Sequence, residues 1–279
     1  MATYADNVTR IFIGSGQSQE VNFRSNPALL PASAIDANIP FNSNGGADFT
    51  PLATDITYLR PQLKNDGGGN GFTDTATAPG TTIPAGYSSW GYGAEMMIGR
   101  NQYSVDRPVA YVKRSAGGTA LGDAGSNPYY HNYQDPTLAQ GFNVSNLIDR
   151  VEGMQAHITS GGRTPVIAGM YFMQGEDDAS DLTAAGGYGY HLSRLIHGLR
   201  AHFQTEFPVV LGLTTTFGTA DGRDLVNKGK IEVAQSLRNV RIYDPTPDNL
   251  PQYTDGHFWQ DAAITIGNRV SAIYDEMGV

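Results

Sequence analysis

The sequence predicts an α/β fold, a three-layer α/β/α sandwich around a parallel sheet of five strands. Three observations support this fold class: short apolar runs alternate with amphipathic helical patterns, these runs are nearly continuous, and neither an internal repeat nor a linker divides the chain. Strands that are buried on both faces of a parallel sheet have such continuous apolar runs, and strand–helix alternation is typical of this architecture. A length of 279 residues suits one large domain, which we assign to residues 1–279.

Five apolar segments are the predicted strands, because each is too short for a helix and lies between turn residues or helical patterns. They are residues 10–13 (RIFI), 108–112 (PVAYV), 165–173 (PVIAGMYFM), 208–213 (PVVLGL) and 240–243. Helices are predicted where apolar residues recur every three or four positions. In chain order they cover residues 94–100, 143–159, 188–203, 223–237 and 262–277.

Residues 24–90 have a different composition, rich in Asn, Gly, Pro, Thr and Ala, with the runs SNGG (43–46) and DGGGNG (66–71). Such residues favour turns and irregular backbone over packed elements. The segment is therefore predicted to be a long loop excursion from the first crossover of the sheet, and not a separate domain. Eight of the 34 glycines of the chain lie in this segment.

Composition excludes several classes of protein. A net charge of −9 argues against a protein that binds nucleic acid through its phosphates, and no apolar run reaches the roughly 18 residues needed to span a membrane. The absence of cysteine excludes disulfides, thiolate metal sites and a cysteine nucleophile. The start, MATYADNVTR, lacks the order of a signal peptide. The compartment stays open: secreted if a signal peptide has been removed, cytoplasmic otherwise.

The predicted site lies at the carboxyl ends of the strands, where parallel sheets bind ligands. The first strand runs into GSGQSQ (14–19), which fails the dinucleotide pattern G-x-G-x-x-G at its last position. Asp36, the acid that such a site would need, lies in a Pro/Ala-rich loop. Neither a phosphate-binding GK[ST] nor a metal-binding H-E-x-x-H is present. We therefore expect no cofactor.

Ser18 is the candidate nucleophile, presented at a tight turn after the first strand. A serine hydroxyl needs a base within hydrogen-bond reach, and His257 in TDGHFW (254–259) precedes the last helix at the same end of the sheet. Asp255 could fix the tautomer of that histidine; the alternative is that DGH is only a turn that starts a helix. The remaining histidines lie in predicted helices (His157, His191, His197 and His202) or in a tyrosine-rich loop (His131).

Two further strand ends carry groups that acyl transfer requires. RSAGGT (114–119) has glycines that allow a backbone N–H to approach a ligand. In QGEDD (174–178) the Gln174 amide can donate to an oxyanion, whereas an ionised Glu176 cannot. Glu176 is therefore assigned to orienting neighbours such as Gln174 or a loop backbone. The alternative is a solvated acidic loop.

Taken in order, GSGQSQ, SAGGT, MQGEDDA and DGH resemble the sialate O-acetylesterase branch of the SGNH (GDSL-like) hydrolases, which includes carbohydrate esterase family six. The resemblance spans residues 10–275 apart from 24–90. It implies a flavodoxin-like α/β/α sandwich and metal-independent removal of acetyl groups from sugars. It further implies that Ser18 is the nucleophile, His257 the base, Gly117 the second-block oxyanion glycine and Gln174 the third-block glutamine.

The chain departs from the pattern of that branch at several positions. Gln19 replaces the usual asparagine after the serine, and Met173 precedes the glutamine in a strand without tryptophan. Asp255 lies two residues before His257, where the branch has a spacing of three. Two arrangements remain open: a triad, if the loop bends at Gly256, or a Ser18–His257 dyad.

The predicted function is a serine esterase that removes O-acetyl groups from a carbohydrate, or from another small acetyl ester, through an acyl-enzyme. The oxyanion donors are the N–H groups of Ser18 and Gly117 and the amide of Gln174. The alternatives are a non-catalytic carbohydrate-binding or structural module on the same fold, and a short-chain esterase or lipase without sugar specificity. No metal is expected, because Asp66 and Asp74 around GGGNG resemble a calcium-binding turn only loosely. Loop aromatics that could stack on a sugar are Tyr87, Trp90, Tyr129, Tyr130 and Tyr133.

Overall fold

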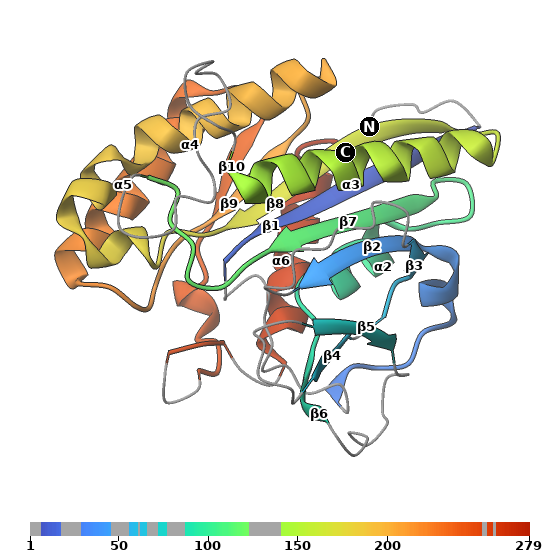
Figure 1. The fold of residues 1–279 in the computed structure, drawn as a ribbon, viewed down its shortest axis with the longest axis horizontal. Helices are drawn as coiled ribbons and strands as arrows, with labels where there is room; N and C mark the ends of the chain where they lie inside the picture. The colour runs from blue at the N-terminus through green and yellow to red at the C-terminus, as the bar shows by residue number, and fades with distance from the viewer. Residues whose placement is uncertain are drawn as a thin grey trace.

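The fold is that of a computed structural model (Figure 1), which describes residues 7–17, 29–45, 56–60, 62–65, 72–76, 87–122, 141–252, 256–258 and 261–279. Among these residues, the main sheet has seven strands in the order β10-β9-β8-β1-β7-β2-β3. Neighbouring strands are parallel except for β3, which pairs antiparallel with β2 at one edge. The strands are β1 (Val8–Gly16), β2 (Pro40–Gly45), β3 (Thr57–Tyr58), β7 (Val109–Ser115), β8 (Thr164–Met173), β9 (Val209–Gly212) and β10 (Val240–Tyr243).

All five predicted strands are present and adjacent, as β7-β1-β8-β9-β10. Numbered along the chain, this is the order 2-1-3-4-5 of flavodoxin-like sheets. The prediction of a five-stranded sheet was nevertheless wrong, because β2 and β3 extend it beyond β7. Both come from the segment that composition assigned to irregular backbone. The sequence of β2, PFNSNG, has no apolar pattern; its pairing follows from backbone hydrogen bonds along β7, which any extended segment can satisfy.

Helices cover both faces of the sheet, so that each face has its own hydrophobic cluster. Helices α3, α4 and α5 supply the cluster on one face, and α2 and α6 supply the cluster on the other. The helices are α2 (Glu95–Gln102), α3 (Phe142–Ser160), α4 (Leu182–Phe203), α5 (Ala220–Ser236) and α6 (Ala262–Glu276). Within the described parts of the chain, no helix is long and apolar enough to cross a membrane.

The starts of the helices differ most from the sequence predictions. Polar capping residues allow a helix to begin before its apolar pattern does. Helix α4 begins at Leu182 and not at residue 188, since the Asp181 carboxylate accepts the N–H groups of Thr183 (2.7 Å) and Ala184 (3.1 Å). Thr219 caps α5 in the same way through the N–H of Gly222. Both caps place their helix N-termini at the carboxyl edge of the sheet.

The excursion also forms a small antiparallel sheet in the order β5-β4-β6, beside the β2 edge of the main sheet (Figure 1). Its strands are β4 (Gln62–Asn65), β5 (Phe72–Ala76) and β6 (Tyr87–Gly91), and the described 3-10 helices are η2 (Ala34–Asn38), η3 (Asp178–Ser180) and η4 (Thr246–Asp248). Short hairpins of this kind lack a long apolar run, which explains why composition alone did not reveal them.

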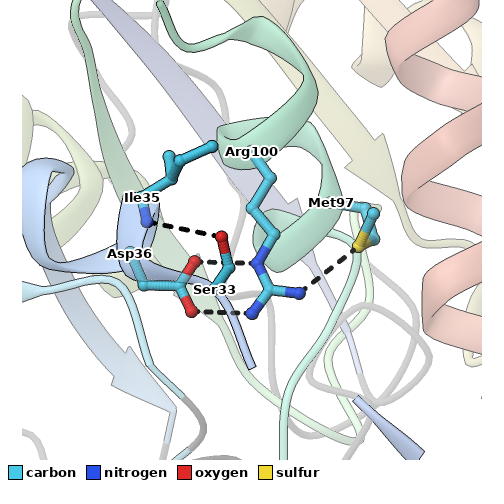
Figure 2. A network of polar contacts seen from close by, with 5 residues as sticks. All are labelled: Ser33, Ile35, Asp36, Met97 and Arg100. Atoms are coloured by element: carbon cyan, nitrogen blue, oxygen red, sulfur yellow. Dashed lines mark hydrogen bonds and ion pairs between the residues drawn. The ribbon is translucent and has the colours of Figure 1, made fainter. Parts of the chain in front are cut away.

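Asp36 joins the excursion to the core through a contact with α2. Its carboxylate accepts two hydrogen bonds from the guanidinium of Arg100 on α2, both at 2.7 Å (Figure 2). The Ser33 hydroxyl accepts the N–H of Ile35 and caps η2. A planar bidentate pair fixes both direction and distance, so η2 is held firmly against α2.

Candidate active site

The ends of β1, β7 and β8 are joined by backbone hydrogen bonds at the carboxyl edge of the sheet. Gly16 is in register with Ser115 on β7 and with Met173 on β8. Just beyond the strands, the Gln17 N–H donates to the Met173 carbonyl (3.0 Å), and the Ala116 N–H donates to the Gly16 carbonyl (3.1 Å). Three of the motifs singled out in the sequence therefore lie side by side.

Gln17, the residue before Ser18, holds the third motif through its side chain. Its buried Oε1 accepts the backbone N–H of Gly175 (3.2 Å) and, at a longer 3.4 Å, that of Asp177. It also lies 3.2 Å from Nε2 of Gln174. These contacts connect the end of β1 to the start of the QGEDD segment. No motif in the sequence predicted this role of Gln17.

The buried amide of Gln174 donates its N–H groups within the protein. Nε2 lies 2.6 Å from Oδ2 of Asp178 and 2.9 Å from the Thr119 carbonyl. The backbone carbonyl of Gln174 accepts the Tyr188 hydroxyl at 3.0 Å. An amide nitrogen has two hydrogens, and both have acceptors here. The oxyanion role predicted for Gln174 is untested, but this geometry leaves no free N–H for it.

The orienting contact that the sequence analysis assigned to Glu176 is made by Asp178. Besides Gln174, the fully buried Asp178 carboxylate accepts the backbone N–H groups of Leu121 and Gly122, at distances of 3.0 to 3.1 Å. The motif QGEDD is therefore not a solvated acidic loop. Its third acid faces inward and bridges to the loop that follows β7, residues 116–122, which we call the β7 loop.

Gly117 lies at the exposed turn of the β7 loop. Within the described part of the chain, its N–H has no hydrogen-bond acceptor. The next residue, Gly118, has φ +64°, a left-handed conformation that favours glycine. An exposed turn of this kind is compatible with the oxyanion assignment of Gly117, which stays a prediction.

Glu176 lies in a buried, charged environment behind these residues. Burial raises the pKa of its carboxyl to about 7, and the neighbouring Asp178 and Asp177 add to the rise while Lys230 opposes it. Burial also lowers the pKa of Lys230, on α5, to about 8. The ammonium of Lys230 donates to the Gly212 carbonyl (2.7 Å) and the Thr214 hydroxyl (2.8 Å). Oxygen Oε2 of Glu176 has no hydrogen-bond partner among the described residues.

The pKa of Glu176 predicts how stability depends on pH. The native carboxyl keeps its proton up to about pH 7, whereas the unfolded one loses it near 4.5, so its contribution to stability falls as the pH rises between these values. Because glutamine cannot ionise, Glu176→Gln should lose less unfolding free energy than the wild type as the pH rises from 4.5 to 7. Urea denaturation across this range measures the difference.

Glu232→Gln is the matched control for this prediction. Glu232 lies on the same helix as Lys230, but it is exposed and pairs with Lys228. Its substitution should leave the pH dependence of stability unchanged. Parallel profiles for Glu176→Gln and the wild type would contradict a buried carboxyl with a raised pKa.

His257 is half-buried, and its ring packs edge-on against Phe217, with ring centroids 4.6 Å apart. Phe217 belongs to the loop after β9, residues 213–219 (the β9 loop), whose Thr214 hydroxyl lies 3.4 Å from the Gln174 carbonyl. Gly256, before the histidine, has φ +86°. The same loop thus contacts both the His257 segment and the end of β8.

Ser18 and Asp255 lie outside the described residues, as do His131 and Asp66. The choice between a triad and a dyad therefore stays open, and the roles of Ser18, Asp255 and His257 remain predictions. Of the helical histidines, His157 and His197 are exposed, and His202 contacts Glu152 at 2.8 Å. His191 lies against Gly122 of the β7 loop. Within the described residues, no cluster of His, Asp or Glu could hold a metal ion.

Gln17, Asp178 and Lys230 are the residues of this region that sequence reasoning missed. Lys230 offered a signal, because it occupies the apolar face of its helix with Val226 and Val233. A lysine at such a position is rarely buried without a partner. Asp178 offered no such signal in the sequence. The turn after β8 decides which of the three successive acids points inward.

Comparisons with known proteins identify the family of the chain. The family model for carbohydrate esterases described as sialic acid-specific acetylesterases matches residues 73–276. No curated protein sequence matches the chain significantly. Similar solved structures include a protein from Arabidopsis thaliana, with a TM-score of 0.64 and 19% identity over 96% of this chain and 98% of that one.

Two other structures are similar to the chain. NanS has a TM-score of 0.63 and 15% identity over 99% of both chains. A carbohydrate acetylesterase from Xanthomonas citri has a TM-score of 0.56 and 17% identity over 94% of this chain and 54% of that one. At these identities the structures establish a shared fold, while the family match covers most of the chain. The protein belongs to the sialic acid-specific acetylesterase family of carbohydrate esterases and is a carboxylic ester hydrolase.

Proposed function

We propose that the protein is a serine esterase that releases acetate from an O-acetylated carbohydrate through an acyl-enzyme. Ser18 attacks the ester carbonyl while His257 takes its proton. His257 then returns this proton to the departing sugar hydroxyl, leaving Ser18 acetylated. Water, deprotonated by the same histidine, releases acetate and restores the serine.

One observation supports the proposal most directly: the segments GSGQSQ, SAGGT and MQGEDDA meet at one edge of the sheet. The chain also belongs to an acetylesterase family. Gln17 is bonded to Met173, and the neighbouring Gly16 to Ala116, so the end of β1 is joined to both the end of β8 and the start of the β7 loop. The exposed Gly117 N–H suits an oxyanion donor, together with the N–H of Ser18. Preorganised donors of this kind contribute ~3–4 kcal/mol each to transition-state stabilisation.

Gln174 enters the proposal in a different way from the backbone donors. Its amide could serve as a third oxyanion donor only by releasing the Thr119 carbonyl or the Asp178 carboxylate. We therefore propose the N–H groups of Ser18 and Gly117 as the principal donors. Asp255 remains the proposed orienting acid for His257.

The test is release of acetate from O-acetylated sialic acid, acetylated xylan and acetylated pectin, compared with p-nitrophenyl esters of increasing chain length. Given the family, we expect release from the O-acetylated sugar acid, and acetate esters to be cleaved faster than octanoate esters. Preference for long acyl chains would instead indicate a lipase. Sugar binding without any acetate release would indicate the non-catalytic module and overturn the proposal.

A further inference from the structure

Asp178 is a buried carboxylate to which the proposed reaction assigns no step. All three of its donors belong to the site: the N–H groups of Leu121 and Gly122, and Nε2 of Gln174. We propose that Asp178 is a positioning residue that sets the conformation of the β7 loop and thereby the place of the Gly117 N–H. This inference rests on the proposed function, because it concerns the oxyanion donors of that reaction.

The β7 loop is held at three places, and Asp178 contributes to two of them. At its start, the Ala116 N–H donates to Gly16 of β1. In its middle, the Thr119 carbonyl accepts Nε2 of Gln174, whose orientation Asp178 fixes at 2.6 Å. At its end, Asp178 itself accepts two successive backbone N–H groups. The exposed turn at Gly117 lies between these attachments.

The interactions of Asp178 are strong enough to hold a loop. A carboxylate has about four lone-pair sites and accepts charge-assisted hydrogen bonds, which are roughly twice as strong as neutral ones. The residue is fully buried, so water does not compete for these donors. Lys230 provides favourable electrostatics from the α5 side, since the Asp178 charge raises its pKa.

A loop held in this way matters for the transition state more than for substrate binding. The negative charge on the ester oxygen develops only during attack, so a displaced Gly117 N–H reduces kcat and leaves KM nearly unchanged. Misplacement of a catalytic group by about 1 Å can reduce the rate ~10²-fold. Asp178 would thus act on the reaction through Gly117, without contacting the substrate.

Asp178→Asn tests the inference with little change in volume. Asparagine has only one side-chain oxygen to accept from the three donors. Its NH₂ group must face at least one of these donors, and that hydrogen bond is lost. Steady-state kinetics with p-nitrophenyl acetate should give a kcat ~10- to 10²-fold lower than wild type, with KM changed less than about threefold. If kcat is retained in a folded variant, the inference is wrong.

Asp181→Ala is the matched control. Asp181 follows closely in the chain and also accepts two backbone N–H groups, but these belong to α4. Losing this cap should lower stability by ~1 kcal/mol and leave kcat unchanged. An equal fall of kcat in Asp181→Ala would mean that destabilisation alone explains the effect, and would overturn the positioning role.

Two further results separate this inference from its premises. If wild type fails to hydrolyse any acetyl ester, the proposed function itself fails. If Asp178→Asn does not unfold cooperatively, Gln174→Leu is the variant to measure instead. Leucine cannot bridge the Asp178 carboxylate and the Thr119 carbonyl, while Asp178 itself stays in place. A lower kcat with an unchanged KM is then expected, and an unchanged kcat contradicts the inference.

Discussion

Replacing Ser18 by alanine is expected to lower kcat for hydrolysis of p-nitrophenyl acetate by ~10⁴-fold or more. The reason is that the covalent route disappears, and only binding and the oxyanion donors continue to assist attack by water. KM should change little, since a methyl group fits where the hydroxyl was. Thermal unfolding should be close to that of the wild type.

Ser193→Ala, on α4, is the control for this experiment and should retain full activity. Mass spectrometry offers an independent measurement: a phosphonate inhibitor should add one covalent group to the wild type and none to Ser18→Ala. Full activity in the serine variant would contradict the acyl-enzyme mechanism. Labelling at another residue would assign the nucleophile elsewhere.

Replacing His257 by alanine is expected to have an effect of similar size, ~10⁴-fold or more in kcat. Without the imidazole, nothing takes the proton of the serine hydroxyl as it attacks. The side chain is half-buried against Phe217, so its removal leaves a space that opens to solvent. Imidazole added to His257→Ala should therefore restore part of the activity in a concentration-dependent way.

His197→Ala is the matched control, because His197 lies exposed on α4. This variant should keep the kcat of the wild type and show no response to imidazole. If His257→Ala retains activity, another group is the base. A loss without imidazole rescue, together with a lower unfolding temperature, would point instead to a structural role of His257 in the contact with Phe217.

The order of the elements, and the meeting of three candidate motifs at one edge of the sheet, were predictable from local patterns. Continuous apolar runs identified β1, β7, β8, β9 and β10, because burial on both faces of a sheet demands them. The segments after these strands then had to meet at one edge, as Gln17, Ala116 and Gln174 do. Strands β2 and β3 were not predicted, because backbone pairing at the edge of a sheet needs no apolar pattern.

The roles of individual acids could not be predicted in the same way. Glu176 and Asp178 are two residues apart and alike in chemistry, and only the turn after β8 decides which of them reaches the β7 loop. The sequence by itself determined the chemical groups available to the site, the strand ends that carry them and the family to which they belong. The tertiary structure alone decided the partners of Gln174 and the burial of Glu176 beside Lys230, because hydrogen-bond geometry and desolvation depend on residues that are distant in the chain.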